Sequence, residues 1–248
     1  MDPDHLAGDP EPPALVAGTA RSGSPPWTLS DPLVAYLASV TLAIVVGSIW
    51  IGVTGEEEVT LGLTITTLFA QWTGMLGGTV LASRRRGTGR LAADVGLRVE
   101  RRDILPGIAA GVLSQLVLLP LLYIPMSFLI DDLDISEEAR ELTGLGSGAG
   151  LVLLSVMIVV GAPLVEEIFF RGLLQQSLTR RFGPGWALGG SSVLFGLTHF
   201  QPLLLPGLIA FGVVLGLLAR RSGRLGPAVI AHMAFNAVTV IALTASRA

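Results

Sequence analysis

Six polar residues in the C-terminal half of this chain have the side chains that a hydrolytic centre needs, although they lie in or beside apolar runs. A charged side chain at membrane depth costs about 2.5 kcal/mol or more, so such residues usually mark a functional site. Here a carboxylate could activate water, an imidazole could hold that water or ligate a metal, and a histidine with an asparagine could donate hydrogen bonds to an oxyanion. The six residues are Glu166, Glu167, Arg171, His199, His232 and Asn236.

Helical spacing separates the two carboxylates by role. Glu167 and Arg171 are four residues apart, so in a helix they share a face and can neutralise each other. Glu166 points about 100 degrees away from Glu167 around the helix, which makes it the candidate for the reactive carboxylate. The alternative interpretation is that both carboxylates only form a buried ion-pair network with Arg171.

The two histidines each have a partner four residues away. Phe195 precedes His199 and Asn236 follows His232, so each pair shares a helical face. A single intramembrane histidine can equally be a hydrogen-bonded packing residue. Two histidines, an asparagine and a glutamate on three different helices favour a common site instead.

Other intramembrane protease chemistries fit the chain poorly. It has no cysteine and no lysine, which excludes thiol nucleophiles, cysteine metal ligands and Schiff bases. It has no His-Glu-x-x-His motif, no aspartate within the apolar spans and no serine in a Gly-x-Ser-x-Gly setting. Serine catalysis is therefore disfavoured.

The elements that must position these residues are apolar segments long enough to cross a bilayer. Hydrophobic residues make up 51% of the chain and charged residues only 14%, well below the roughly 25% of soluble domains. We predict an all-α, polytopic transmembrane helical bundle of about seven spans, the third kinked by Pro106, Pro120 and Pro125. The apolar segments cover residues 33–53, 59–82, 104–130, 151–181, 186–200, 203–219 and 226–245.

The chain divides into three parts along its length. Residues 1–32 are rich in proline, glycine and acidic residues and predict a disordered cytoplasmic tail. Residues 33–148 are predicted to hold the N-terminal transmembrane helices and loops, and residues 149–248 the catalytic membrane core. Three glycine pairs have the four-residue spacing that allows close helix contacts: Gly74 with Gly78, Gly107 with Gly111, and Gly212 with Gly216.

Charges between the spans alternate in sign. Arginines follow the second, fourth and sixth spans, and the positive-inside rule places them in the cytoplasm. Acidic clusters at 56–58 and 131–141 then face outward. These charges predict an integral membrane protein with a cytoplasmic N-terminus, and the composition, rich in arginine, alanine and glycine, indicates a bacterial plasma membrane. No feature points to nucleic-acid binding.

Three motifs, taken together and in order, resemble those of a known family. They are Glu166-Glu167-x-x-x-Arg171, Phe195-x-x-x-His199 and His232-x-x-x-Asn236. The pattern is similar to that of the CPBP family of intramembrane metalloproteases, which comprises the CAAX prenyl endopeptidases and the bacteriocin-processing or self-immunity proteins, also called Abi proteins. The resemblance covers about residues 150–245.

The resemblance implies a role for each residue of the site. Glu166 and His199 would activate water, His232 and Asn236 would stabilise the oxyanion, and Glu167 with Arg171 would support the site. It also implies a catalytic cavity within the bilayer that opens toward the cytoplasm.

The resemblance leaves two mechanisms open. Catalysis could depend on zinc held by Glu166, His199 and His232, or it could be metal-independent and rest on the glutamate. A bacterium need not contain prenylated CAAX proteins, so that substrate is not carried over.

The leading hypothesis is therefore an intramembrane endopeptidase whose partners are the lipid bilayer and a peptide or membrane-anchored protein substrate. The alternative is a non-catalytic membrane scaffold or a bacteriocin self-immunity protein, because a fold can be kept for binding alone. A weaker third hypothesis is a transporter with protonatable intramembrane residues.

Overall fold

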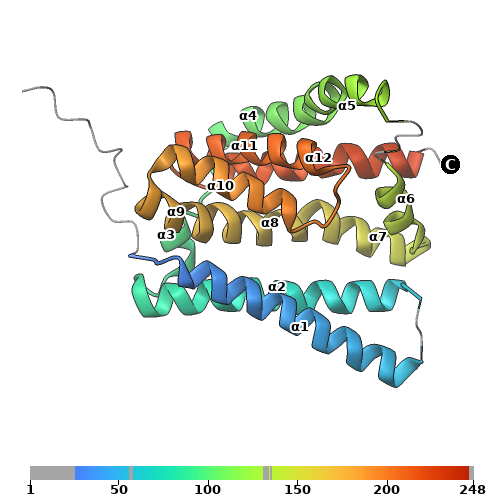
Figure 1. Cartoon of the computed structure of the whole chain (residues 1–248), viewed down its shortest axis with the longest axis horizontal. Coiled ribbons are helices and arrows are strands. Elements are labelled where there is room, and N and C mark those ends of the chain that lie inside the picture. Colours follow the sequence, from blue (N-terminus) through green and yellow to red (C-terminus); the bar gives the residue numbers. More distant parts are fainter. Residues whose placement is uncertain (1–25, 56–57, 131–133, 135, 246–248) are drawn as a thin grey trace, which may run out of the picture.

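The computed structural model describes residues 26–55, 58–130, 134 and 136–245, and the regular elements in this part of the chain are all helices (Figure 1). This confirms the predicted all-α helical bundle. The α-helices are α1 Ser30–Thr54, α2 Leu61–Arg86, α3 Leu91–Val95, α4 Arg101–Leu113, α5 Leu119–Ser127, α6 Glu137–Gly144, α7 Gly148–Val156, α8 Ala162–Glu166, α9 Gln175–Phe182, α10 Pro184–Leu197, α11 Leu205–Ser222 and α12 Gly226–Ala245. Three π-helical segments join some of them: η1 Ser114–Leu118, η2 Met157–Gly161 and η3 Glu167–Leu174.

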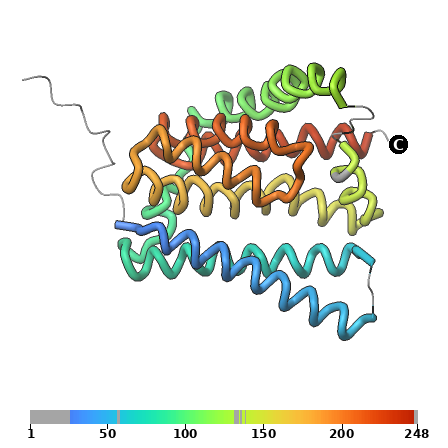
Figure 2. The backbone as a smooth tube through the Cα atoms, in the orientation of Figure 1, coloured from blue at the N-terminus to red at the C-terminus, as the bar shows by residue number. Residues whose placement is uncertain are grey.

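The helices form layers with the long helix α7–α9 in the middle. The α1–α2 hairpin packs on one side of it, through α8 and η3. On the other side α12 lies between that long helix and α4, as the trace in Figure 2 shows, and α10 pairs with α9 and α11. The segment that carries the two glutamates therefore has neighbours from both halves of the chain.

Within the described residues, five helices are long and apolar enough to cross a membrane. They cover Ser30–Thr54, Arg101–Ser127, Gly148–Phe182, Leu205–Ser222 and Gly226–Ala245. Many of their large apolar side chains are exposed, among them Leu105, Leu121 and Val152, as expected for surfaces that contact lipid. Of the other two predicted spans, α2 is long but less apolar than these five helices, and α10 has only 14 residues. The predicted number of seven is therefore approximate.

Prolines explain two of the π-helical segments. Pro120 follows η1 and Pro163 follows η2, each by two residues. A proline has no N–H to donate to the carbonyl four residues before it, and its ring crowds that carbonyl, so the preceding turn widens. The expected distortion at Pro120 thus takes the form of a π-turn.

The glycine pairs all lie at close helix contacts. A Cβ atom at Gly111 would overlap the backbone carbonyl oxygen of Ala231 on α12, and one at Gly74 would overlap the backbone of Ser39 on α1. At Gly212, an added Cβ would lie 3.1 Å from the Cα atom of Ser192 on α10. Small residues thus let these helices approach more closely than larger side chains would allow.

The start of the bundle differs from the predicted tail boundary. Residues 1–25 of the predicted tail lie outside the described residues, but α1 begins at Ser30 and Trp27 is only 2% exposed. Asp31 explains the early start, because its carboxylate accepts a hydrogen bond from the Thr28 N–H at 2.7 Å and pairs with Arg86 of α2 at 3.1 Å. The last residues of the predicted tail are therefore part of the packed structure. Much of the predicted outer acidic clusters, residues 56–57, 131–133 and 135, also lies outside the described residues.

Candidate active site

The structure brings Glu166, Glu167, Arg171 and His232 into contact, whereas His199 is connected to them through Phe195 and Asn236 contacts the backbone at Ile158. Glu166 ends α8 and Glu167 begins η3, while His232 and Asn236 lie on α12. His199 lies just beyond α10 rather than on it, because that helix ends at Leu197 and the chain turns before Pro202. Phe200 in this turn has a φ of 55°, a left-handed conformation that no α-helix could continue.

Glu167 is the buried anchor of the site. Its side chain is fully buried, and its Oε1 accepts a hydrogen bond from Arg171 Nη1 at 3.0 Å. The same oxygen lies 3.0 Å from Nδ1 of His232. The predicted pairing of Glu167 with Arg171 is confirmed, although the segment is π-helical where the spacing argument assumed an α-helix.

Arg171 connects this anchor to two further helices. Its Nη2 donates to the Gly212 carbonyl of α11 at 3.1 Å, and its guanidinium carbon lies 4.5 Å from the centre of the Phe195 ring of α10. A buried guanidinium needs such partners, because each unpaired N–H is costly away from water. Nε of Arg171 has no hydrogen-bond partner among the described residues. Arg171 therefore fixes η3 against the helices that carry the rest of the site.

Glu166 faces the other nitrogen of the same imidazole. Its Oε2 lies 3.8 Å from His232 Nε2, and its side chain is 19% exposed. This separation is too long for a direct hydrogen bond. The Glu166 Oε2 is buried and has no hydrogen-bond partner among the described residues. Both glutamates therefore approach the same imidazole, and each keeps one buried oxygen without a hydrogen-bond partner among the described residues; Glu166 differs from Glu167 in being partly exposed.

The proton on His232 follows from these contacts. The Glu167 carboxylate is an acceptor when ionised, so Nδ1 must carry a proton to donate to it. In a neutral ring, Nε2 would then be a lone-pair acceptor facing Glu166. In a doubly protonated ring Nε2 would be a donor, and the charges of Glu166, Glu167, Arg171 and His232 would sum to zero.

His199 is oriented by the backbone of the helix before it. Its Nδ1 lies 2.7 Å from the Phe195 carbonyl oxygen, which can only accept, so Nδ1 carries the proton and Nε2 is left as the free nitrogen of a neutral ring. The rings of His199 and His232 both contact Phe195 edge to face, with centroids 4.8 and 5.7 Å away. Phe195 thus brings the two imidazoles into the same region.

Asn236 reaches the distorted turn before Pro163. Its Nδ2 donates to the Ile158 carbonyl at 2.8 Å. In this turn the Ala162 N–H bonds to the carbonyl of Met157, and residue 163 is a proline with no N–H. The asparagine therefore supplies a donor that the backbone lacks at Ile158. Its amide has a second N–H that can serve other acceptors.

The structure adds residues that the sequence reasoning missed. Gln175 donates to the Gly216 carbonyl at 3.3 Å and so repeats, one turn later, the contact of Arg171 with Gly212. The signal was available, because Gln175 continues the four-residue spacing of Glu167 and Arg171. The Phe211 ring lies 5.4 Å from that of His232, edge to face, and no local pattern pointed to it.

The predicted zinc ligands do not converge in this arrangement. Glu166 Oε2 and His232 Nε2 face each other, but within the described part of the chain no three His, Asp or Glu side chains form a group that could hold a metal ion. The donor set therefore does not fit a three-ligand zinc site, and zinc binding stays an untested prediction.

Comparisons with known proteins bear on the C-terminal part of the chain. Residues 148–238 match the family described as Type II CAAX prenyl endopeptidase Rce1-like, and the matched segment contains all six residues of the site. Neither a curated protein nor a solved structure matches the chain. The family match agrees with the resemblance drawn from the three motifs.

Proposed function

We propose that this integral membrane protein is an endopeptidase that cleaves a peptide or a membrane-anchored protein, because its segment 148–238 matches the family described as Type II CAAX prenyl endopeptidase Rce1-like. The observation that supports this most directly is the placement of one imidazole between two carboxylates of different character. Glu167 is fully buried and paired with Arg171, whereas Glu166 is 19% exposed and its Oε2, which has no hydrogen-bond partner among the described residues, faces Nε2 of His232.

In the proposed reaction, Glu166 acts as the general base. A water molecule held by Glu166 and by the free Nε2 of His199 loses a proton to the carboxylate and attacks the scissile carbonyl carbon. The negative charge that develops on the carbonyl oxygen needs hydrogen-bond donors. Asn236, through its second N–H, and the doubly protonated form of His232 are the donors, and Glu166 then returns the proton to the leaving amine.

Glu167 and Arg171 act on this reaction through His232. The hydrogen bond from Nδ1 to Glu167 fixes the orientation of the ring, so that Nε2 points toward Glu166. A carboxylate behind a catalytic imidazole commonly has this orienting role. The site is further proposed to open toward the cytoplasm, since the connections rich in arginine are predicted on that side.

The test compares Glu166→Gln with the wild type. The substitution keeps the shape of the side chain and removes its basicity, so cleavage should fall by about 10³-fold or more while the protein still inserts and folds. Membrane and secreted peptides from cells that express each form at matched levels would reveal a substrate, which the purified protein should then cut. Glu137→Gln, an exposed glutamate of α6, is the matched control and should retain full activity.

The outcome also separates the two main hypotheses. Full cleavage by Glu166→Gln would exclude Glu166 as the base. If the peptides are the same for both forms while the biological effect of the wild type persists in the variant, the scaffold or self-immunity hypothesis becomes the better one.

Metal dependence is tested with the same purified protein. Since only two of the three predicted zinc ligands converge, we expect cleavage to survive a strong chelator and the metal content after dialysis to stay well below one zinc per chain. Loss of activity on chelation, restored by zinc alone, would support the zinc-dependent mechanism instead.

A further inference from the structure

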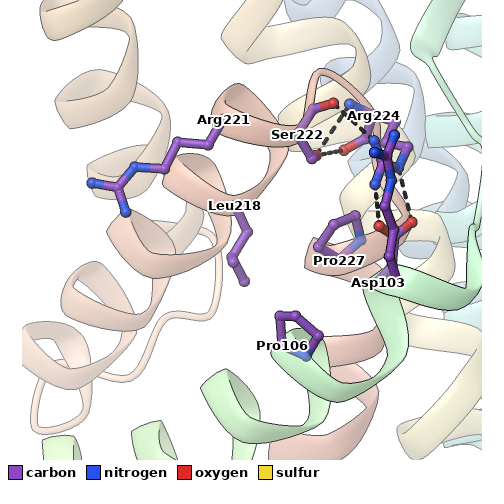
Figure 3. Close-up of a pocket in the computed structure, with 8 residues that line it drawn as sticks. Asp103, Pro106, Leu218, Arg221, Ser222, Arg224 and Pro227 are labelled. Atoms are coloured by element: carbon purple, nitrogen blue, oxygen red, sulfur yellow. Dashed lines mark hydrogen bonds and ion pairs between the residues drawn. The ribbon is translucent and has the colours of Figure 1, made fainter.

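An open cavity with arginines on its rim lies at the end of the bundle where α4 begins and α11 turns into α12. It has a volume of about 400 Å³. In Figure 3, Asp103 and Pro106 of α4 lie on one side and Leu218 and Arg221 of α11 on the other. Arg224 and Pro227 lie at the turn between α11 and α12, and the Arg221 side chain extends away from Asp103 and Arg224. The residues that line it include Arg102, Pro106, Leu218, Arg221, Arg224 and Pro227. None of them belongs to the site described above.

A buried ion pair holds the two sides of this cavity together. Arg224 Nε donates to Asp103 Oδ2 at 2.9 Å, a second guanidinium nitrogen contacts Asp103 Oδ1, and Arg224 Nη1 donates to the Ser222 carbonyl at 3.1 Å. Asp103 Oδ2 also accepts the Glu100 N–H at 2.8 Å. Since the side chains of Asp103 and Arg224 are 1% and 9% exposed, the pair links α4 to the turn before α12 and keeps the cavity preformed.

The rim of the cavity has a surplus of positive charge. Segments 98–103 and 220–224 together hold six arginines and two acidic residues. Asp103 is matched by Arg224, but Glu100 is shared among three arginines, at 2.5 Å from Arg98 and Arg102 and 3.6 Å from Arg224, so it neutralises only part of their charge. Arg221 lines the cavity and has no ion-pair partner in the described part of the chain. An anion would supply the missing counter-charge.

The rest of the cavity is apolar and opens beside a surface suited to lipid. Pro106, Leu218 and Pro227 form its inner walls. On α4, close to these residues in sequence, Leu105 is 76% exposed and Ile104 is 46% exposed. The cavity lies at the ends of three candidate spans, where lipid headgroups meet the hydrocarbon region. A free phosphate would use the arginines only, whereas an amphipathic anion would use both surfaces.

We propose that this cavity binds the phosphate of an anionic phospholipid, with Arg221 and Arg102 at the headgroup and with the glycerol and upper acyl chains against Pro106 and Leu218. Basic pockets between transmembrane helices are a known way to hold such headgroups. Bound lipid would brace α4 against α11 and α12, and α12 carries His232 and Asn236.

Native mass spectrometry of the full-length protein in neutral detergent tests this directly, with phosphatidylglycerol as the probe and phosphatidylcholine as the neutral reference. The double variant Arg102→Gln/Arg221→Gln leaves the Asp103–Arg224 pair intact, so the frame of the cavity is kept. Each arginine removed should weaken phosphatidylglycerol binding roughly fivefold. Arg84→Gln, an exposed arginine at the end of α2, is the matched control and should leave binding unchanged.

Three results would overturn the proposal. Equal weakening by Arg84→Gln would show a diffuse surface charge in place of a site. Unchanged binding by the double variant would show that the cavity is not used. If inorganic phosphate displaced phosphatidylglycerol with an affinity equal to that of the lipid, the cavity would be a site for free phosphate. The experiment measures lipid binding and not cleavage. Its result therefore tests the lipid site independently of the proposed protease activity.

Discussion

The imidazole of His232 and the amide of Asn236 project from α12 one turn apart, yet they make different kinds of contact. His232 bonds to the Glu167 side chain, whereas Asn236 bonds to the backbone carbonyl of Ile158. Sequence spacing placed both on one helical face and paired Glu167 with Arg171. It could not predict which groups they meet, because 65 and 78 residues separate the partners of these two bonds.

The two adjacent glutamates should respond differently to the same substitution. Glu167→Gln leaves the Arg171 guanidinium buried without its counter-charge, so the protein should lose about 3–5 kcal/mol of stability as well as activity. Glu166→Gln should lose activity alone. Thermal unfolding in detergent measures the difference, and equal stabilities of the two variants would contradict the buried anchor role of Glu167.

Asn236 should have a structural and a catalytic role that can be separated. Asn236→Ala leaves the Ile158 carbonyl without its donor, at a cost of about 1–3 kcal/mol. Pro163→Ala restores an N–H in the same turn, so the cost of Asn236→Ala should shrink in that background. A double-mutant cycle of unfolding free energies measures this coupling.

Cleavage by the double variant Pro163→Ala/Asn236→Ala then tests the proposed catalytic role of Asn236. We expect cleavage to stay low in Pro163→Ala/Asn236→Ala, because the oxyanion donor is still missing. Recovery of cleavage together with stability would mean that Asn236 acts only through the helix.

At the scale of helices, close packing depends on single glycines whose partners lie far away in the sequence. The four-residue spacing predicted close contacts, and the structure supplies the partners: α1 for Gly74, α12 for Gly111 and α10 for Gly212. The prolines indicated kinks but not their form. That α7 to α9 passes through two π-helical segments depends on the packing around it, which the sequence pattern does not report.

A pair of identical substitutions tests this packing. Gly111→Ala places a methyl group against the Ala231 carbonyl and the backbone nitrogen of Phe235, so it should cost about 1–3 kcal/mol in unfolding free energy. Gly77→Ala on α2 has no atom within 4 Å of the added Cβ, and it should be neutral or slightly stabilising. Equal effects would show that the α4–α12 contact is looser than described.

The whole molecule is a helical membrane protein. Its orientation in the membrane is predicted only from the distribution of charged residues between the spans. Hydropathy predicted the bundle well, because about half of the residues are apolar and lipid leaves few alternatives to helices. Among the described residues, two of the predicted spans differ from the other five: α2 is less apolar and α10 is short. The predicted orientation of the spans can be tested by labelling.

Labelling of single cysteines provides this test, and the natural chain contains no cysteine that would interfere. Glu58→Cys lies between α1 and α2, and Arg90→Cys lies just before α3; both positions are exposed. With the N-terminus in the cytoplasm, a membrane-impermeant maleimide should label Glu58→Cys in intact cells and Arg90→Cys only after the membrane is opened. The reverse pattern would invert the topology.

The π-helical segments also limit where residues can be inserted into or deleted from the chain. A π-turn holds one residue more than the α-turn that it replaces, so each such segment shifts the phase of every later side chain on the same helix. Deleting one residue within Met157–Gly161 would turn Glu166 and Glu167 together, by about 100 degrees, relative to α7. A sequence with a one-residue gap at this place should therefore present a different helix face to His232, even if every motif residue were kept.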